Sequence, residues 1–331
     1  MQIISDKKIE TLRNFIYAHD FFYIAGHKDP DGDCVYSCLA FSKLIESFGK
    51  EFQLVNAGPF KKSEISDKAE FFTNIPQFLS EPERKKSALI MLDCSEIKRL
   101  GELEEDLSSL DTFIIDHHKT SQETENSIID SSSPATCSIV QQIFEKMPVE
   151  IDKTVAEYIF FGQATDTNYF KFLDESSEEV FLQTARLVKC GVNPRKIHDK
   201  ITGGHPYSTR KLLGVLLTRA EKYFNGKLVI TWETLEDTKK YGLNGRDSDA
   251  LYTLFLSTEG VEAVVFARQD TEYKCTAGFR SKDKIDVSTV AQKFGGGGHK
   301  NAAGMSVQGK LENIIPAIQK EFARILENKN S

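Results

Sequence analysis

Short, continuously apolar runs alternate with helical patterns along the first 190 residues of the chain. The runs include FFYIAG (21–26), SALIML (87–92) and TFII (112–115). Strands that are apolar on both faces are typical of a parallel sheet whose two faces are covered by helices. We therefore predict an α/β domain built on a mostly parallel sheet with flanking helices.

The pattern changes after residue 190, where the segment CGVNPRKIHDKITGGHPYSTR is rich in Gly, Pro and polar residues. Segments of this composition often connect domains. Beyond it, shorter helical and strand patterns predict a smaller α+β domain. With 331 residues, the chain is long enough for two cores. We predict domains over 1–190 and 212–331, joined by a connector over 191–211.

Composition excludes several classes of protein. The chain has a net charge of −7, which argues against a broad basic face that tracks a long duplex, so any nucleic-acid partner is expected to be short. Six cysteines are present, but none forms a C-x-x-C pair, so neither a disulfide framework nor a thiolate zinc site is indicated. The sequence contains no long apolar run and no signal-peptide pattern, and we expect a cytoplasmic protein with no membrane partner.

Acidic and imidazole side chains follow three of the apolar runs directly. HKDPDGD (27–33) comes after the first run, Asp93 ends the second, and Asp116, His117 and His118 end the third. In an open α/β sheet, ligands bind outside the carboxyl ends of the strands. We therefore expect the three groups of side chains to meet in one crevice.

Such a crevice needs cations, because crowded carboxylates repel one another and raise one another's pKa values. A mixture of imidazole and carboxylate without thiolate favours Mn²⁺ or Mg²⁺, with Co²⁺ as a substitute. Six or more candidate donors are too many for one ion, and a pair of ions is suited to phosphoester hydrolysis. Alone, an Asp-Pro-Asp-Gly-Asp stretch is more often a helix cap, and a single His-His pair is a weak signal. Three such groups at three strand ends are a much stronger one.

At the level of motifs, the chain resembles the DHH phosphoesterase family with its DHH-associated C-terminal domain. The motifs that carry the resemblance span nearly the whole chain in order: HKDPDGD (27–33), LDCS (92–95), DHH (116–118), ATDT (164–167), GFRS (278–281) and GGGGHKNAAG (295–304). The chain is most similar to the stand-alone branch of nano-RNases (oligoribonucleases) and 3'-phosphoadenosine-5'-phosphate (pAp) phosphatases. The resemblance implies a catalytic metal-binding domain, a substrate-binding domain and an active-site cleft between them.

The resemblance also implies a site with two Mn²⁺ ions bridged by Asp93. The implied ligands of one ion are His27, Asp31 and Asp93, and those of the other are Asp33, Asp93, His117 and Asp166. The implied catalytic residues are His118, facing the scissile phosphate, and Asp116, which supports the imidazoles. One departure stands out: the family commonly has glycine after TDT, whereas this chain has Asn168 and Tyr169.

In the C-terminal domain, the run Gly295 to Gly298 could let backbone N–H groups converge on an anion. The run lacks the G-x-x-x-x-G-K-[ST] spacing of a Walker A loop, and a glycine run is more often a flexible loop. Arg280 offers a bidentate fork to a terminal phosphate. The residues that we expect to bind substrate are Arg280, Ser281, Gly296, Gly297, Gly298, His299 and Asn301. We assign no role to Arg268.

These features predict a manganese-dependent phosphodiesterase that cuts oligoribonucleotides of two to four residues, including linear diadenylate, to nucleoside monophosphates, with pAp as a further substrate. The first alternative is a cyclic di-AMP phosphodiesterase, and the second is a non-catalytic nucleotide-binding sensor. A processive single-strand DNA exonuclease and a pyrophosphatase of the same family are less favoured. The former would need additional nucleic-acid-binding domains, and the latter lacks the glycine run. A homodimer is left open.

Overall fold

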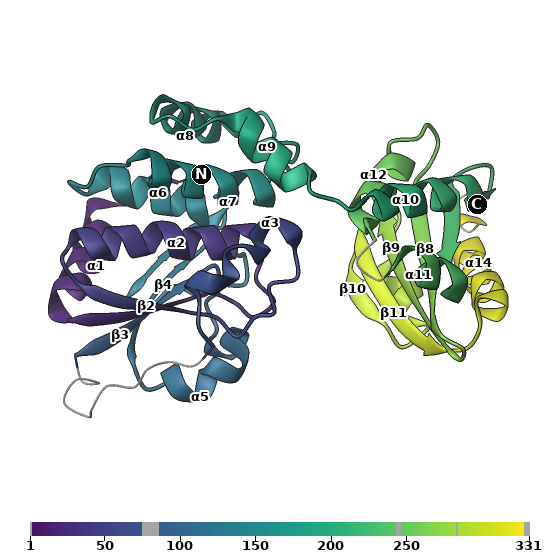
Figure 1. Ribbon diagram of the computed structural model, residues 1–331, viewed down its shortest axis with the longest axis horizontal. Helices are drawn as coiled ribbons and strands as arrows, with labels where there is room; N and C mark the ends of the chain where they lie inside the picture. The colour runs from purple at the N-terminus through teal and green to yellow at the C-terminus, as the bar shows by residue number, and fades with distance from the viewer. Residues whose placement is uncertain (1, 75–85, 243–245, 283, 328–331) are drawn as a thin grey trace. The chain divides into compact units, whose positions relative to one another are not determined.

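The computed structural model describes residues 2–74, 86–242, 246–282 and 284–327, which form two compact units. The first unit runs from Met1 to Gly204 and the second from His205 to Ser331 (Figure 1). In the described ranges, no helix combines the length and the apolar character needed to cross a membrane.

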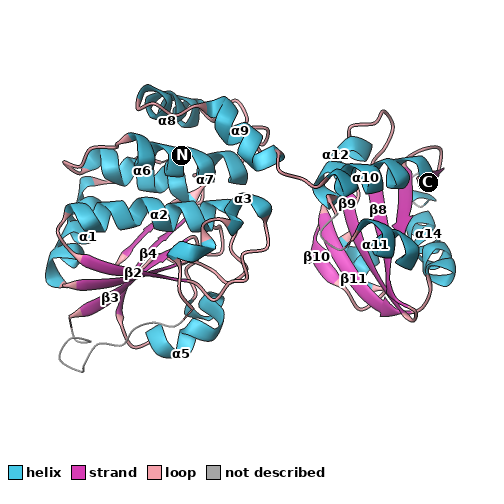
Figure 2. Cartoon of the chain, viewed as in Figure 1, coloured by secondary structure: helices cyan, strands magenta, loops and turns pink. Residues whose placement is uncertain are grey.

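The first unit is built on a five-stranded sheet with the order β2-β1-β3-β4-β5, and every paired neighbour is parallel (Figure 2). The strands are β1 (Phe21–Ala25), β2 (Glu51–Val55), β3 (Ser87–Leu92), β4 (Asp111–Asp116) and β5 (Ser127–Ile129). All six residues of β3 are buried, as expected for a central strand that is covered on both faces. The predicted α/β architecture is therefore confirmed.

Helices cover both faces of this sheet, and the side chains of β1 alternate between them. Phe22 and Ile24 pack in the core beneath α1 (Asp6–Ala18), α2 (Gly32–Ser47), α6 (Thr136–Lys146) and α7 (Lys153–Asp166). Tyr23 and Ala25 pack on the opposite face with η2 (Ile97–Leu103) and α5 (Glu104–Leu107). Short elements α3 (Ser63–Ser66) and η1 (Ala69–Phe71) follow β2. The period-2 alternation of a strand thus supplies two separate apolar layers.

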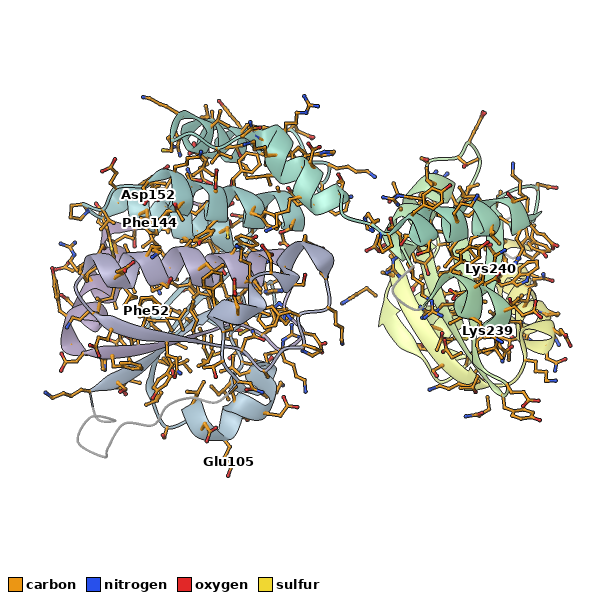
Figure 3. All side chains as sticks on the ribbon, viewed as in Figure 1. Phe52, Glu105, Phe144, Asp152, Lys239 and Lys240 are labelled. Carbon is orange, nitrogen blue, oxygen red and sulfur yellow. The ribbon has the colours of Figure 1, made fainter. Side chains whose placement is uncertain are left out.

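The outer helices begin at side-chain caps that the sequence encodes locally. The carboxylate of Asp152, labelled in Figure 3, accepts a hydrogen bond of 2.8 Å from the backbone N–H of Val155 and starts α7. Phe144, labelled in the same figure, is buried on the inner face of α6. Two further helices, α8 (Glu178–Lys189) and α9 (Pro194–Thr202), lie outside α6 and α7 (Figure 1).

The strand order reverses between β1 and β3. The chain leaves β1 toward one side of the sheet, to β2, and then crosses back to β3 on the other side of β1. At such a switch point the loops that follow the two strands diverge and leave a crevice at their carboxyl ends. His27 follows β1 and Asp93 follows β3, so the first two predicted groups flank this crevice.

The second unit contains a six-stranded sheet of order β10-β11-β9-β8-β7-β6, in which only the β7–β8 pair is parallel. Helices α13 and α14 pack on one face, and α10 and α12 pack on the other. This is the predicted α+β architecture. The strands are β6 (Glu221–Tyr223), β7 (Leu228–Glu233), β8 (Ala263–Thr271), β9 (Lys274–Ser281), β10 (Gly297–His299) and β11 (Ala302–Gln308). The helices are α10 (Tyr207–Arg219), α11 (Leu235–Tyr241), α12 (Ser248–Leu256), α13 (Ser288–Gln292) and α14 (Leu311–Glu327).

The boundary between the units falls inside the predicted connector over 191–211. The units divide between Gly204 and His205, and most of the predicted connector is helical. Its Gly, Pro and Asn residues mark helix ends instead: the side chain of Asn193 caps α9, Pro194 occupies the first turn, and Pro206 precedes α10. Proline is well suited to the first turn of a helix, where its missing N–H has no intrahelical partner.

Close packing of α7 against its neighbours depends on Gly162. A Cβ atom at this position would lie 2.2 Å from Sγ of Cys137 and 2.8 Å from Oδ1 of Asp33. Both neighbours are buried. By contrast, Gly214 in α10 is exposed and a Cβ atom there would meet nothing within 4 Å.

We expect Gly162→Ala to destabilise the protein by about 1–3 kcal/mol through overpacking. The matched change Gly214→Ala should stabilise it by about 0.5–1 kcal/mol, because alanine lowers the conformational entropy of the unfolded helix segment. Scanning calorimetry of both variants measures the two shifts in melting temperature. Equal shifts of the same sign would contradict the packing argument.

Candidate metal centre

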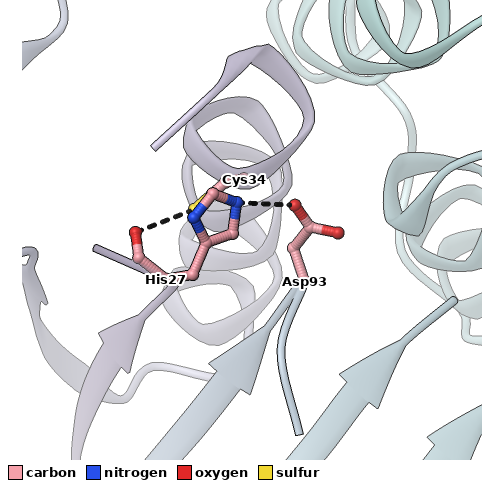
Figure 4. A group of neighbouring side chains, drawn as sticks. All are labelled: His27, Cys34 and Asp93. Carbon is pink, nitrogen blue, oxygen red and sulfur yellow. Dashed lines mark hydrogen bonds and ion pairs between the residues drawn. The ribbon is translucent and has the colours of Figure 1, made fainter. Parts of the chain in front are cut away.

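His27 stands immediately beyond β1 and presents one ring nitrogen to the crevice. Its Nδ1 lies 2.9 Å from the carbonyl oxygen of Lys28. A carbonyl can only accept, so Nδ1 carries the proton and Nε2 keeps its lone pair. Nε2 lies 3.4 Å from Oδ2 of Asp93 (Figure 4). It also lies 3.9 Å from Oδ1 of Asp31. This orientation leaves an imidazole lone pair directed at two carboxylates.

Asp93 lies at the centre of the group and faces two histidines with different oxygens. Oδ2 faces His27, and Oδ1 lies 3.5 Å from Nε2 of His117. Oδ1 also accepts a hydrogen bond of 3.0 Å from the hydroxyl of Thr136. The backbone of Asp93 is left-handed, with φ of 62°, a conformation that costs a non-glycine residue about 1–3 kcal/mol. Its N–H donates to the carbonyl of Ile115 on β4 at 3.0 Å, which holds the residue there.

His117 and Asp166 complete the far side of the group. The Nδ1 of His117 donates to the carbonyl of Ser133 at 3.2 Å, so its Nε2 also carries a free lone pair. This Nε2 lies 3.3 Å from Oδ2 of Asp166, the last residue of α7. The site therefore draws on a helix as well as on three strand ends, as the ATDT motif led us to expect.

Asp33 reaches the site from the first turn of α2 and sits at the start of another helix. Its two oxygens accept from the backbone N–H groups of Thr136 and Cys137, at 2.6 and 2.9 Å. These groups belong to the first turn of α6, where N–H groups lack intrahelical partners and favour a negative charge. Asp31 caps α2 itself, because its Oδ1 accepts from the N–H of Cys34 at 3.1 Å. The helix-cap and metal-donor roles of Asp31 are thus compatible.

The carboxylates of the site repel one another when ionised. Burial raises the pKa of Asp93 and Asp33, and for Asp93 the neighbouring Asp33 and Asp31 raise it further. Burial, followed by repulsion from Asp33 and Asp31, raises the pKa of Asp166 to about 8. Cations would relieve this repulsion and let all the carboxylates ionise.

The donor atoms fit divalent metal ions. Within the described residues, three overlapping groups have donor atoms that all lie within 4.8 Å of one another. The groups are His27, Cys34 and Asp93; Asp93, His117 and His118; and Asp33, His117 and Asp166. Asp93 and His117 are each shared by two groups. Imidazole nitrogen and carboxylate oxygen are suitable donors for Mn²⁺.

Cys34 was not anticipated at the site, but it remains a neutral thiol. Burial raises the pKa of Cys34 well above its usual value. Its Sγ–H donates to the carbonyl oxygen of His27 at 3.7 Å (Figure 4). The thiol therefore supports the backbone of His27, and the expectation that the cysteines behave as small buried groups holds here.

His118 is held differently from the other two histidines. Its Nδ1 donates to Oδ1 of Asp116 at 2.7 Å, which leaves Nε2 free. The same carboxylate accepts from the backbone N–H groups of His117 and His118 at 2.8 and 3.2 Å and from the hydroxyl of Ser121. Burial alone would raise the pKa of Asp116, but the hydrogen bonds from His118 and Ser121 lower it overall. The hydrogen bond that His118 donates to Asp116 in turn raises the pKa of His118.

The loop after Asp166 has Asn168 and Tyr169 where the family commonly has glycine, and its backbone is still left-handed. Asn168, Tyr169 and Phe170 all have left-handed backbones, with φ of 49°, 53° and 67°. Glycine adopts this conformation without cost, whereas other residues pay about 1–2 kcal/mol each. Here the loop is held by its side chains, because the hydroxyl of Tyr169 donates to the carbonyl of Pro194 at 2.7 Å and Phe170 packs on Phe160.

A separate groove lies on the second unit, on the face of its sheet next to α12. It has a volume of about 620 Å³, within the usual range for small-molecule sites. Arg280 lies over the ring of Tyr252, with 4.8 Å from its guanidinium carbon to the ring centre. Gly278 lets this ring lie against the sheet, since a Cβ atom there would be 2.2 Å from the tyrosine hydroxyl oxygen. Among the predicted substrate-binding residues, those that line the groove are Arg280, Gly296, Gly297 and Gly298.

Three other predicted residues do not line it. Ser281 follows Arg280 in β9, and neighbouring strand residues point to opposite faces. Its hydroxyl is buried and donates to the carbonyl of Ile285 at 2.6 Å. The side-chain amide of Asn301 donates to the carbonyl of Ser281 at 3.1 Å, and His299 ends the edge strand β10. Ser281 and Asn301 therefore have structural hydrogen bonds that the sequence did not reveal.

The glycine run also has a role that was not predicted. Gly297 to His299 form β10, which pairs with β11 as an antiparallel hairpin. A Cβ atom on Gly296 would lie 2.2 Å from the carbonyl oxygen of Gly304, and one on Gly298 would lie 2.5 Å from that of Ala302. The glycines therefore allow close approach of two backbones, whereas we had expected a free anion-binding loop.

Sequence reasoning assigned no role to three other groove residues, Tyr252, Phe266 and Arg268. Arg268 on β8 lies directly across from Thr276 on β9, and its Nε donates to that hydroxyl at 3.2 Å. Arg268 and Phe266 share one face of β8, and Tyr252 comes from α12. The only sequence signal for these residues is the alternation of side chains along β8. That alternation does not indicate which face of the sheet carries the groove.

Two domain families match the chain. The model of the DHH family, N-terminal domain, matches residues 22–163, and that of the DHHA1 domain matches residues 225–328. The first match contains every predicted metal-site residue except Asp166. The second contains the groove residues of the sheet and of α12.

Similar proteins agree with these matches. The chain is 29% identical over 315 residues to a bifunctional oligoribonuclease and PAP phosphatase, NrnA, of Thermus thermophilus, covering 91% of this chain and 90% of that one. It is 25% identical over 315 residues to the cyclic-di-AMP phosphodiesterase PdeA of Listeria monocytogenes, covering 89% of this chain but 46% of the relative. Among solved structures, an exopolyphosphatase-related protein of Bacteroides fragilis superposes with a TM-score of 0.79 at 23% identity, covering 99% and 98% of the two chains.

The repulsion around Asp93 predicts an unusual effect on stability. A carboxyl whose pKa is raised by folding destabilises the protein above its unfolded pKa, and the penalty grows as the pH rises toward the folded value. In chelator at pH 7.5, Asp93→Asn should therefore raise the melting temperature, by about 2–4 °C for each kcal/mol recovered. The gain should shrink as the pH falls toward about 4, where the carboxyl becomes protonated in the unfolded chain as well.

With Mn²⁺ added, the wild type should have a higher melting temperature than Asp93→Asn, because the wild type gains metal-binding energy that the variant cannot. Thermal melts with and without metal at the two pH values measure both effects. Asp199→Asn, which changes an exposed carboxylate of α9, serves as the control and should show neither. A variant that is less stable than wild type in chelator at pH 7.5 would contradict the electrostatic account.

Proposed function

This chain belongs to the DHH phosphoesterase family, and we propose that it is a manganese-dependent phosphodiesterase that cuts oligoribonucleotides of two to four residues to nucleoside monophosphates. Linear diadenylate is included among these substrates, and pAp is a further one. The proposal is supported by the activity for which the Thermus relative is named, a protein that matches nearly the whole of both chains. The observation that carries it is the position of Asp93, whose two oxygens face His27 and His117 from opposite sides.

We assign the metal donors to two overlapping sets. His27, Asp31 and Asp93 would hold one ion, and Asp33, Asp93, His117 and Asp166 would hold the other. The measured separations support the assignment, since each histidine presents a free Nε2 within 3.5 Å of Asp93. When bound, the two ions would supply Lewis acidity for attack on phosphorus and neutralise the charge that develops on the phosphate.

The role assigned to His118 follows from its hydrogen bond to Asp116. Because Nδ1 is engaged at 2.7 Å, Nε2 is the atom that would hold a proton toward the phosphate. The pKa of His118 is raised by Asp116, which favours the protonated, donating form. Asp116 would act as a positioning residue, because it fixes the ring and the N–H groups of both histidines. The partial exposure of His118 leaves its ring accessible to a substrate.

The two adjacent histidines should respond differently to substitution. His117→Ala removes the Nε2 that faces Asp93 and Asp166 and should lower the amount of bound metal. His118→Ala should leave the metal content near that of the wild type but lower kcat about 100-fold or more, as expected for the loss of a general acid. Elemental analysis and steady-state kinetics of both variants decide the matter. Equal loss of metal in the two variants would refute the division of roles.

The groove of the second unit is assigned to the nucleotide. Arg280 would contact a terminal phosphate, and Arg268 adds a second positive charge on the same groove. Its size and its two arginines suit a nucleotide or two, and the net charge of −7 offers no support for an extended basic track. Binding energy should therefore come from residues next to the scissile bond, which favours short substrates.

We expect linear diadenylate to be cleaved with a higher kcat/KM than either a twenty-residue single strand or cyclic di-AMP. The ring has no terminal phosphate for Arg280 to bind. Arg280→Ala should raise KM for the linear substrate about tenfold or more and narrow its advantage over the cyclic one, since a charge-assisted hydrogen bond contributes about 1.5–3 kcal/mol. Arg324→Ala provides a matched control, because that arginine pairs with Glu321 on α14. Kinetics with the three substrates measure these changes.

A preference for the ring would favour the alternative of a cyclic di-AMP phosphodiesterase. The activity for which the Listeria relative is named supports this alternative, although the chain covers less than half of that protein. A non-catalytic sensor would be favoured by missing donors, but all six assigned metal donors, together with His118 and Asp116, are present.

A further inference from the structure

A row of polar side chains crosses the groove of the second unit at a distance from Arg280. The pairing register places Arg268 on β8, Thr276 on β9 and Ser306 on β11 directly opposite one another. Residues that pair in this way share one face of the sheet, and all three line the groove. We call them the distal row. It presents a guanidinium and two hydroxyls to one part of the groove.

The distal row is separated from Arg280 by glycine. Arg280 pairs with Val264, four positions before Arg268 on β8, so the two arginines start about 13 Å apart along the sheet at about 3.3 Å per residue. The row between them contains Gly278 on β9, which pairs with Gly304 on β11. No side chain of β9 or β11 therefore rises from the sheet between the two positive charges.

Each arginine is held within its own row and lacks an acidic partner. Nε of Arg268 donates to the hydroxyl of Thr276 at 3.2 Å, which leaves the two terminal nitrogens free. One terminal nitrogen of Arg280 donates to the carbonyl of Phe279 at 3.0 Å. Among the described residues, neither arginine forms an ion pair, and none of those that line the groove is acidic. Two separate, uncompensated guanidinium groups favour two separate anionic groups.

The hydroxyl of Tyr252 lies between the two arginines and has no partner. The tyrosine is only 6% exposed, its oxygen lies over Gly278, and in the described part of the chain this oxygen forms no hydrogen bond. A buried polar atom usually has a partner. Burial raises the pKa of Tyr252 to about 12, against the opposing effect of the positive charges of Arg280 and Arg268. The hydroxyl is therefore protonated at neutral pH and can donate to an anion in the groove.

We propose that the distal row is a second phosphate subsite, which binds the 5'-terminal phosphate of an oligonucleotide of three residues. This inference rests on the proposed function, in which the metals hold the scissile phosphate and Arg280 holds the next one. A 5'-phosphorylated dinucleotide has no further phosphate, whereas a 5'-phosphorylated trinucleotide has one more. Arg268 binds it through the free terminal nitrogens. Thr276 and Ser306 donate their hydroxyl protons, and Tyr252 donates to the part of the chain between the two phosphates.

The test measures kcat/KM of the full-length chain with Mn²⁺ for diadenylate with a 5'-phosphate and for triadenylate with and without one. Arg268→Gln should lower kcat/KM for 5'-phosphorylated triadenylate at least about tenfold, because it removes a charge-assisted hydrogen bond. The same variant should change kcat/KM for the other two substrates less than about twofold, since neither places a phosphate at the distal row. Removing the 5'-phosphate and removing the guanidinium should therefore be strongly non-additive.

Two further variants sharpen the test. Arg324→Gln removes an arginine that pairs with Glu321 on α14, outside the groove, and should leave all three values of kcat/KM unchanged. Tyr252→Phe keeps the ring over Gly278 and removes only the hydroxyl, so it should lower kcat/KM for 5'-phosphorylated triadenylate about two- to tenfold. Melting curves within a few degrees of the wild type confirm that the variants fold.

Two results would overturn the subsite alone while diadenylate is still cleaved by the wild type. An equal loss in Arg268→Gln with and without the 5'-phosphate would show that the arginine does not bind that group. An equal loss for diadenylate would show that both arginines hold one phosphate. A wild-type chain that cleaves neither diadenylate nor triadenylate would instead refute the proposed function, and the subsite with it.

Discussion

The repulsion between buried carboxylates at the ends of β1 and β3 is the constraint on which the rest of the first unit depends. Asp33, Asp93 and Asp166 converge where water is largely excluded, and the pKa of each is raised. A fold does not bring such groups together without compensation. Backbone N–H groups of α6, the hydroxyl of Thr136 and two imidazoles offset part of the cost. Divalent cations would offset the remainder, and metal binding would then favour folding of this unit.

In the three histidines of the site, the group that accepts the hydrogen bond from Nδ1 decides whether Nε2 offers a lone pair or a proton. His27 and His117 each donate a hydrogen bond from Nδ1 to a backbone carbonyl. The lone pair on Nε2 is therefore directed at the carboxylates. His118 instead donates a hydrogen bond from Nδ1 to the carboxylate of Asp116. A carboxylate partner favours the charged form of the ring. Three identical side chains thus receive two roles, and the choice is made by a carbonyl or a carboxylate on the far side of the ring.

The second unit arranges its groove through strand alternation. Arg268 and Arg280 come from neighbouring strands, and Tyr252 reaches them from α12 because Gly278 leaves space for its ring. The same alternation turns Ser281 away into the interior. In this unit glycine serves close approach rather than flexibility, both beneath Tyr252 and in the β10–β11 hairpin. The two units therefore separate the assigned tasks: crowded acids for the metals, and a local pair of arginines for the nucleotide.

The sequence by itself determined the parallel sheet, the two units and the group of donors at the strand ends. These follow from local patterns: apolar runs with period 2 or no period, and polar residues directly after them. The orientation of Asp93 between His27 and His117, the left-handed turn at Asn168 to Phe170 and the loss of Ser281 and Asn301 from the groove were decided only by the tertiary structure. Each depends on partners far away in the chain, such as Ser133 for His117 or Pro194 for Tyr169. A sequence names the donors, but the hydrogen bond on the other side of each side chain, which sets its direction, forms only when distant segments pack together.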